Sequence, residues 1–70
     1  MLKFEKREDW CTKKTYYEVR LITKHGNAHF AEIWKVKNGY EIYYNDEVIF
    51  SKTLKEAKMN CDFLRWKETA

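Results

Sequence analysis

The fold is decided by residues 36–58, VKNGYEIYYNDEVIFSKTLKEAK. Asn38-Gly39 is a typical turn, and the extended apolar run that follows it, residues 40–44, is followed by a second polar turn and a further apolar run. Thr53 with Glu56 three positions later is the pattern of a capping box, which marks the first turn of a helix. This stretch therefore predicts a β-hairpin that leads directly into a helix.

Composition indicates one small domain with a mild positive charge. The chain has 70 residues, a size near the lower limit for a single hydrophobic core, and a formal net charge of +3. Its 3 Trp, 5 Tyr and 4 Phe offer much apolar area per residue, which favours folding without disulfides. Cys11 and Cys61 lie far apart and no signal peptide is evident, so we predict reduced thiols in a cytoplasmic protein. No run approaches the roughly 20 apolar residues that span a bilayer, so no membrane association is expected.

Residues 15–51 predict antiparallel strands. The alternation of polar and apolar residues places one strand over residues 15–23 and a second over residues 28–37, with Gly26 and Gly39 in turns. The side chains expected on the core face of these two strands are Tyr17, Val19, Leu21, Phe30, Trp34 and Val36.

The register of the hairpin depends on the length of its loop. A two-residue loop at Asn38-Gly39 would mix polar and apolar side chains on each face of the sheet. A three-residue loop, with Gly39 left-handed in a bulge, places Trp34 opposite Ile42 and gives one apolar face, so we predict it. The same reasoning at the second turn places Ile42 opposite Phe50.

A helix is expected over residues 53–67, and residues 1–14 are expected to form an N-terminal lead. On a helical wheel, the core stripe is Leu54, Ala57, Cys61 and Leu64, and the roughly opposite stripe is Met59, Phe63 and Trp66. The second stripe has two interpretations: Leu2, Phe4 and Trp10 of the lead cover it, or it is an interface for another protein or a second copy. The predicted fold class is α+β, a three- to four-stranded antiparallel sheet with one C-terminal helix packed on one face.

The opposite face of the sheet also carries more apolar residues than solvent exposure requires. The side chains expected there are Tyr16, Glu18, Arg20, Ile22, His29, Ala31, Ile33, Lys35, Tyr43 and Ile49. Tyr43 and Ile33 are therefore candidates for a partner-binding surface, together with Met59, Phe63 and Trp66.

Residues typical of catalysis or metal binding do not form a motif in this sequence. His25, His29, Cys11 and Cys61 lack the spacing of zinc ligands, and Cys61 lies on the predicted core stripe. There is no glycine-rich phosphate loop and no nucleophile elbow. We therefore predict a protein that is not an enzyme and that needs neither a metal nor a cofactor.

Lysines gather at the expected helix start, where the backbone N–H groups and the helix dipole also favour a phosphate. They are Lys52, Lys55 and Lys58. Such a cluster contacts the nucleic-acid backbone and does not read bases.

Three segments resemble a degenerate double-stranded-RNA-binding domain. They are HGNAHF (residues 25–30), VKNG (36–39) and SKTLKEAK (51–58). The resemblance covers residues 25–64 and implies that Lys52, Lys55 and Lys58 contact phosphates, with His29 in the region of the loop histidine. The family's first helix has little room in residues 1–14. The order of strands followed by a helix is also similar to the arm-binding domains of phage integrases, which insert their sheet into a DNA groove.

The general character of the chain, small and rich in Lys, Glu and aromatic residues, resembles the accessory proteins of tailed phages. Many of those proteins bind and block a host protein. The sequence therefore predicts a small non-enzymatic protein that binds and inhibits or regulates a host protein. The alternative is a module that binds double-stranded RNA or DNA through the lysines at the helix start.

Overall fold

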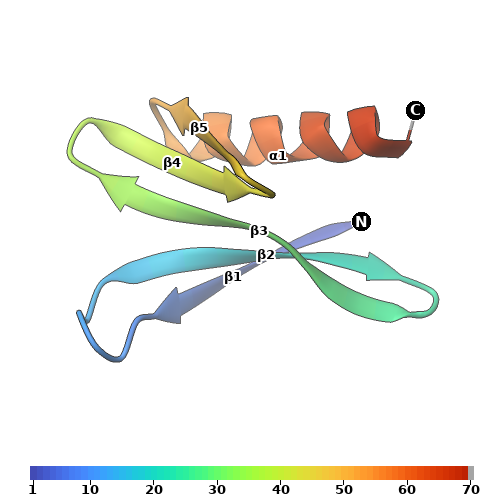
Figure 1. Ribbon diagram of the computed structural model, residues 1–70, viewed down its shortest axis with the longest axis horizontal. Helices are drawn as coiled ribbons and strands as arrows, with labels where there is room; N and C mark the ends of the chain where they lie inside the picture. Colours follow the sequence, from blue (N-terminus) through green and yellow to red (C-terminus); the bar gives the residue numbers. More distant parts are fainter. Residues whose placement is uncertain (70) are drawn as a thin grey trace.

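The structure, a computed structural model, describes residues 1–69 and the side chains of residues 1–67. Five strands form one antiparallel sheet in chain order: β1 (Leu2–Glu8), β2 (Thr15–Thr23), β3 (Gly26–Val36), β4 (Gly39–Tyr44) and β5 (Glu47–Ser51). One helix follows, α1 (Leu54–Thr69), and it lies along β4 and β5 (Figure 1). The predicted α+β class, an antiparallel sheet with one C-terminal helix, is confirmed.

The sheet has five strands instead of the three or four predicted, because the segment expected to be an N-terminal lead forms β1. This strand pairs with β2, with Phe4 opposite Val19 and Leu2 opposite Leu21. Leu2 and Phe4 pack against the core, and Lys3 between them lies on the other face. The charged composition of residues 2–8 hid a two-residue alternation, which is the period of a strand with one buried face.

The core lies between one face of the sheet and α1. Six apolar side chains in it are fully buried: Val19, Ala31, Ile33, Ile42, Ala57 and Cys61. We call the face of the sheet toward α1 the inner face and the opposite one the outer face. The predicted core stripe of the helix is confirmed, since Ala57 and Cys61 are buried and Leu54 and Leu64 are half-buried.

A bulge in β3 reverses the faces predicted for this strand. Val19 pairs with Ala31 but Arg20 pairs with His29, so that Phe30 has no opposite residue. Phe30 therefore packs against the core beside Ala31, and beyond the bulge the order of inner and outer residues is inverted. The inner residues are Ala31, Ile33 and Lys35, and the outer ones are Glu32, Trp34 and Val36, which corrects the prediction for Trp34 and Val36.

Both hairpins after β3 have two-residue turns, and each predicted register is wrong by one residue. Val36 pairs with Gly39 across the first turn, so that Ile42 is opposite Ile33 instead of Trp34. Across the second turn, Ile42 pairs with Ile49 instead of Phe50. Ile49 consequently packs on the core, whereas Phe50 and Val48 are exposed on the outer face.

Gly39 lacks the left-handed backbone that the predicted loop required. A Cβ atom at this position would collide with the Ser51 carbonyl oxygen and would lie 2.8 Å from the ring of Phe50. Glycine is therefore needed for the close approach of β5 and not for its backbone freedom. Positive φ angles occur instead at Lys13 (φ 62°), at Asn45 (φ 53°), in the second turn, and at Gly26 (φ 119°).

The helix begins as the capping pattern predicts. The Glu56 backbone N–H donates to Thr53 Oγ1 at 3.1 Å, which satisfies one of the free donors of the first turn. Ser51, immediately before, is buried and accepts a hydrogen bond from Asn60 Nδ2 at 2.7 Å, which fixes the angle between β5 and α1. Within residues 1–69, no helix has the length and apolar character that crossing a membrane requires.

Candidate binding surfaces

The second stripe of α1 is exposed. Met59, Phe63 and Trp66 are 61%, 58% and 64% exposed, and the Phe63 and Trp66 ring centroids lie 6.1 Å apart. We call these three residues the helix face.

The N-terminal segment does not cover the helix face, because β1 belongs to the sheet and Trp10 is 80% exposed. The interpretation that Leu2, Phe4 and Trp10 bury it is therefore wrong, while an interface at this site stays a prediction.

The three lysines at the helix start lie in two different environments. Lys52 and Lys55 are exposed on either side of the N-cap residue. Lys58 is half-buried, and its Nζ lies 5.3 Å and 5.7 Å from the ring centroids of Phe4 and Tyr17, where cation–π attraction favours it. His29 lies on the outer face of the sheet, opposite Arg20. Of the four predicted nucleic-acid-binding residues, only Lys52 and Lys55 are exposed at the start of the helix.

The two sheet residues predicted for partner binding differ in exposure. Tyr43 is on the outer face and 41% exposed, as predicted. Ile33 is fully buried between the sheet and α1, so this candidate is wrong: the bulge in β3 turns it inward. Lys35 is also on the inner face, with its Nζ 4.9 Å from the Tyr40 ring centroid.

The outer face of β1 and β2 carries an ion-pair network centred on Glu18. Its carboxylate accepts hydrogen bonds from Arg20 at 2.6 Å and Arg7 at 3.3 Å, and His29 Nδ1 lies 3.3 Å away. Partial desolvation raises the pKa of Glu18, but the hydrogen bonds from His29 and Arg20 outweigh it and leave the pKa below its ordinary value. Glu5 is likewise paired with Arg7. In this half of the face, the carboxylates of Glu5 and Glu18 both have basic partners.

The outer face of β3, β4 and β5 is aromatic and acidic. The Tyr16 ring, from β2, stacks on Trp34 at a centroid distance of 4.3 Å and an interplanar angle of 9°. Trp34 Nε1 donates to Glu32 at 2.9 Å, and the Tyr43 hydroxyl donates to Glu41 at 2.8 Å. The bond to the Glu41 carboxylate raises the pKa of Tyr43.

Sequence reasoning missed this surface because it assigned Trp34 to the core. A signal was present, since Tyr16 was placed on the outer face and strand-pairing aromatic residues favour one another.

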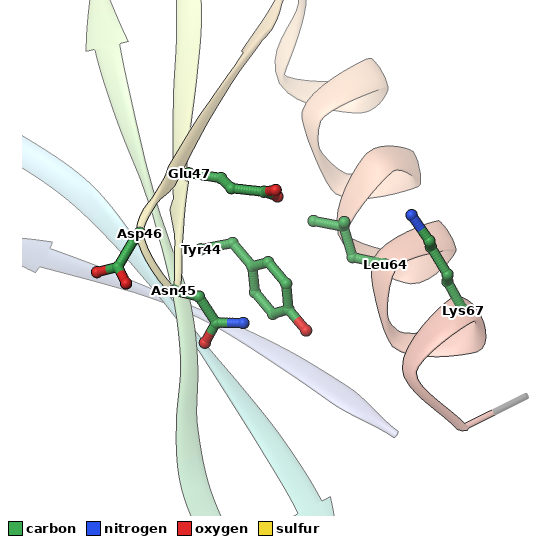
Figure 2. A pocket seen from close by; sticks show the side chains of 6 residues that line it. All are labelled: Tyr44, Asn45, Asp46, Glu47, Leu64 and Lys67. Carbon is green, nitrogen blue, oxygen red and sulfur yellow. The ribbon is translucent and has the colours of Figure 1, made fainter.

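A pocket of about 480 Å³ lies between the β4–β5 turn and the last turns of α1. Its lining residues are Tyr44, Asn45, Asp46, Glu47, Leu64 and Lys67. Figure 2 shows the Tyr44 ring and the Glu47 carboxylate directed toward α1, with Leu64 facing them.

The two thiols are in contrasting environments. Cys11 is exposed in the β1–β2 connection, and Cys61 is buried on the side of α1 that faces the sheet. Burial, assisted by the neighbouring Asp62, raises the pKa of Cys61 to about 12. In the described part of the chain, no three His, Cys, Asp or Glu side chains lie close enough together to hold a metal ion.

Comparison of the chain with protein-family models, curated proteins and solved structures finds no significant match. The resemblance to double-stranded-RNA-binding domains is therefore untested by any relative. In the structure, the segment where that family has its first helix is the strand β1.

Proposed function

We propose that the protein is a small non-enzymatic binding protein whose helix face docks into an apolar groove of another protein. The observation that carries this proposal is the exposure of Met59, Phe63 and Trp66 on one side of a 16-residue helix. Their spacing, i, i+4 and i+7, is the spacing of the anchor residues by which an amphipathic helix occupies a hydrophobic groove. Phe and Trp are also among the side chains enriched in the cores of protein interfaces.

The fold itself does not need the helix face. Ala57 and Cys61, on the other side of α1, already close the core against the sheet. Three large apolar side chains gathered in water favour association, and such clusters commonly mark interaction sites. The exposed residues that flank the helix face, Lys55 and Asp62, are charged, as the rim of an interface is.

An inhibitory or regulatory role follows from this mode of binding. A groove filled by α1 is closed to the segment that it normally binds, so the complex blocks the partner without any chemistry. This role fits the resemblance to tailed-phage accessory proteins, in which the partner is a host protein.

The variant Phe63→Asp tests the proposal. Phe63 is exposed, so the variant should fold, but a carboxylate would be buried at the centre of the interface. Loss of an anchor of this kind costs at least about 2 kcal/mol, a weakening of roughly 30-fold or more. Lys24→Asp is the matched control, because it introduces the same carboxylate at an exposed position of the β2–β3 turn.

The measurement is capture of partners from a nuclease-treated lysate, at low and at high salt, with circular dichroism to verify folding. We expect one protein to be retained in stoichiometric amount by the wild type and by Lys24→Asp at both salt concentrations, and to be lost with Phe63→Asp. An unfolded Phe63→Asp protein would show that the helix face stabilises the core. Equal capture by a folded Phe63→Asp variant would refute the proposed interface.

Nucleic-acid binding is the second candidate function. It is supported by the exposure of Lys52 and Lys55 beside the capped N-terminus of α1, where the helix dipole attracts a phosphate. The same capture without nuclease distinguishes it, since retention of nucleic acid that falls steeply with salt indicates phosphate contacts.

A further inference from the structure

Four residues on the outer face form a square across β3 and β4. Glu32 pairs with Tyr43, and Trp34 pairs with Glu41. The two carboxylates are therefore diagonal neighbours, and the two aromatic side chains occupy the other diagonal. Each carboxylate accepts a hydrogen bond from the aromatic residue two positions later in its own strand. We call these four residues the carboxylate–aromatic square.

Apolar side chains surround the square. Tyr16 extends it on the β2 side by stacking on Trp34. On the β5 side, Phe50 is opposite Glu41 and Val48 is opposite Tyr43, and these two residues are 51% and 57% exposed. The two carboxylates thus lie among partly exposed aromatic rings. A cation bound there would contact the face of an aromatic ring and a carboxylate at the same time.

No ion pair among the described residues compensates the charge of the square. Glu18 and Glu32 are directly opposite each other, and like charges at such positions destabilise a sheet. Glu18 is neutralised by Arg20 and Arg7. Neither Glu32 nor Glu41 has an ion pair among the described residues, although the chain as a whole carries a net charge of +3. A cation from outside would therefore meet two carboxylates, Glu32 and Glu41, that have no basic partner among the described residues.

We propose that the carboxylate–aromatic square docks an extended, arginine-bearing segment of a partner protein. A guanidinium group is planar and always charged, so it stacks on an aromatic ring while it donates hydrogen bonds to a carboxylate. Diagonal positions of an antiparallel ladder lie about 7–8 Å apart, and alternate residues of an extended chain lie about 7 Å apart. Glu32 and Glu41 therefore match two arginines separated by one residue. The surface is on the opposite side of the sheet from α1, so both faces bind independently.

The probe is the peptide acetyl-Ala-Arg-Ala-Arg-Ala-amide, compared with the same peptide in which citrulline replaces arginine. Citrulline has nearly the same shape but no charge. The signal is the indole N–H resonance of Trp34, which is hydrogen-bonded to Glu32 and lies within the square. We expect it to shift saturably with the arginine peptide. The citrulline peptide cannot form the charge pairs and offers no cation to the rings, so it should bind about fivefold to tenfold more weakly.

The double variant Glu32→Gln/Glu41→Gln keeps the shape of the square and removes its charge. The double variant should bind the arginine peptide more weakly than the wild type does, by a similar factor. Its weak binding of the citrulline peptide should be unchanged. Glu47→Gln is the control, because it removes a carboxylate from the same hairpin on the side facing α1 (Figure 2). The folded state of each variant is verified from its full amide spectrum.

Three outcomes would overturn the proposal: equal affinity for both peptides, undiminished binding by the folded double variant, or no shift of Trp34. A shift of Trp34 with a single-stranded oligonucleotide but not with the arginine peptide would assign the face to nucleic acid instead. Phe63→Asp should bind the peptide like the wild type, which separates this test from that of the helix face.

Discussion

Replacement of Gly39 by Ala tests the close approach of β4 and β5. The added methyl group would collide with the Ser51 carbonyl oxygen and lie 2.8 Å from the Phe50 ring. Overpacking of this kind costs about 1–3 kcal/mol, and the reduced freedom of the unfolded chain offsets about 0.4–1 kcal/mol of that. We expect a net loss of about 1–2 kcal/mol, which lowers the melting temperature of a domain of this size by about 4–16 °C.

The assay is thermal and urea denaturation followed by circular dichroism, and Gly39→Asn makes it decisive. Asn adopts the left-handed conformation more readily than Ala does, so a left-handed Gly39 would make Asn the milder change. If instead there is no space for a Cβ atom at position 39, Asn should be at least as destabilising as Ala, because both side chains have a Cβ atom. Gly26→Ala is the comparison, since nothing lies within 4 Å of its Cβ and its cost comes from a φ of 119°. Wild-type stability of Gly39→Ala, or a milder effect of Asn, would refute the reasoning.

Two further predictions concern titratable groups. Glu18→Gln should lower the free energy of unfolding by about 1 kcal/mol at neutral pH, because Arg20 and Arg7 lose their carboxylate partner. The folded-state pKa of Glu18 is lowered, so its contribution is complete above the ordinary value of 4.5 and is lost as the pH falls through the folded pKa. Melting curves of wild type and variant should therefore converge in acid, and a difference independent of pH would contradict the network. A thiol-reactive reagent should label Cys11 in the native protein but Cys61 only after unfolding, since Cys61 is buried with its pKa raised to about 12. Equal labelling rates of the two thiols would show that α1 opens readily.

The helix was predictable in position and orientation, whereas the strands were predictable in position only. The wheel position of Met59 or Cys61 follows from the chain once the helix start at Thr53 is known. A strand has a period of two, so one residue of error in a turn inverts every side chain after it. This error exchanged Ile49 with Phe50 at the second hairpin. At the first hairpin, the outward-facing residues Trp34 and Val36 alternate along β3 as regularly as the buried residues do, so the sequence pattern did not distinguish the two faces.

The candidate surfaces show the same division. The position of the helix face was predictable, because its residues lie opposite a stripe that the core must use, whereas the sequence left open whether the N-terminal segment covers it. The carboxylate–aromatic square was not predicted, because it depends on the bulge at Phe30 and on pairing across β3 and β4. A bulge leaves no clear signal in a sequence where aromatic residues occur on both faces. Ile33 was misassigned for that reason.

The chain order of the sheet has a consequence for how the protein folds. Each strand pairs with the strand that precedes or follows it, so the sheet assembles by closing successive hairpins, each over a short loop. Chains dominated by such local contacts fold rapidly, and the sequence contains no proline whose isomerisation could delay the process. We expect that β1, β2 and β3 can pair with one another before the residues that follow them have been synthesised. The docking of α1, which buries Ala57 and Cys61, needs β4 and β5 in place, so we expect it to follow the pairing of these strands.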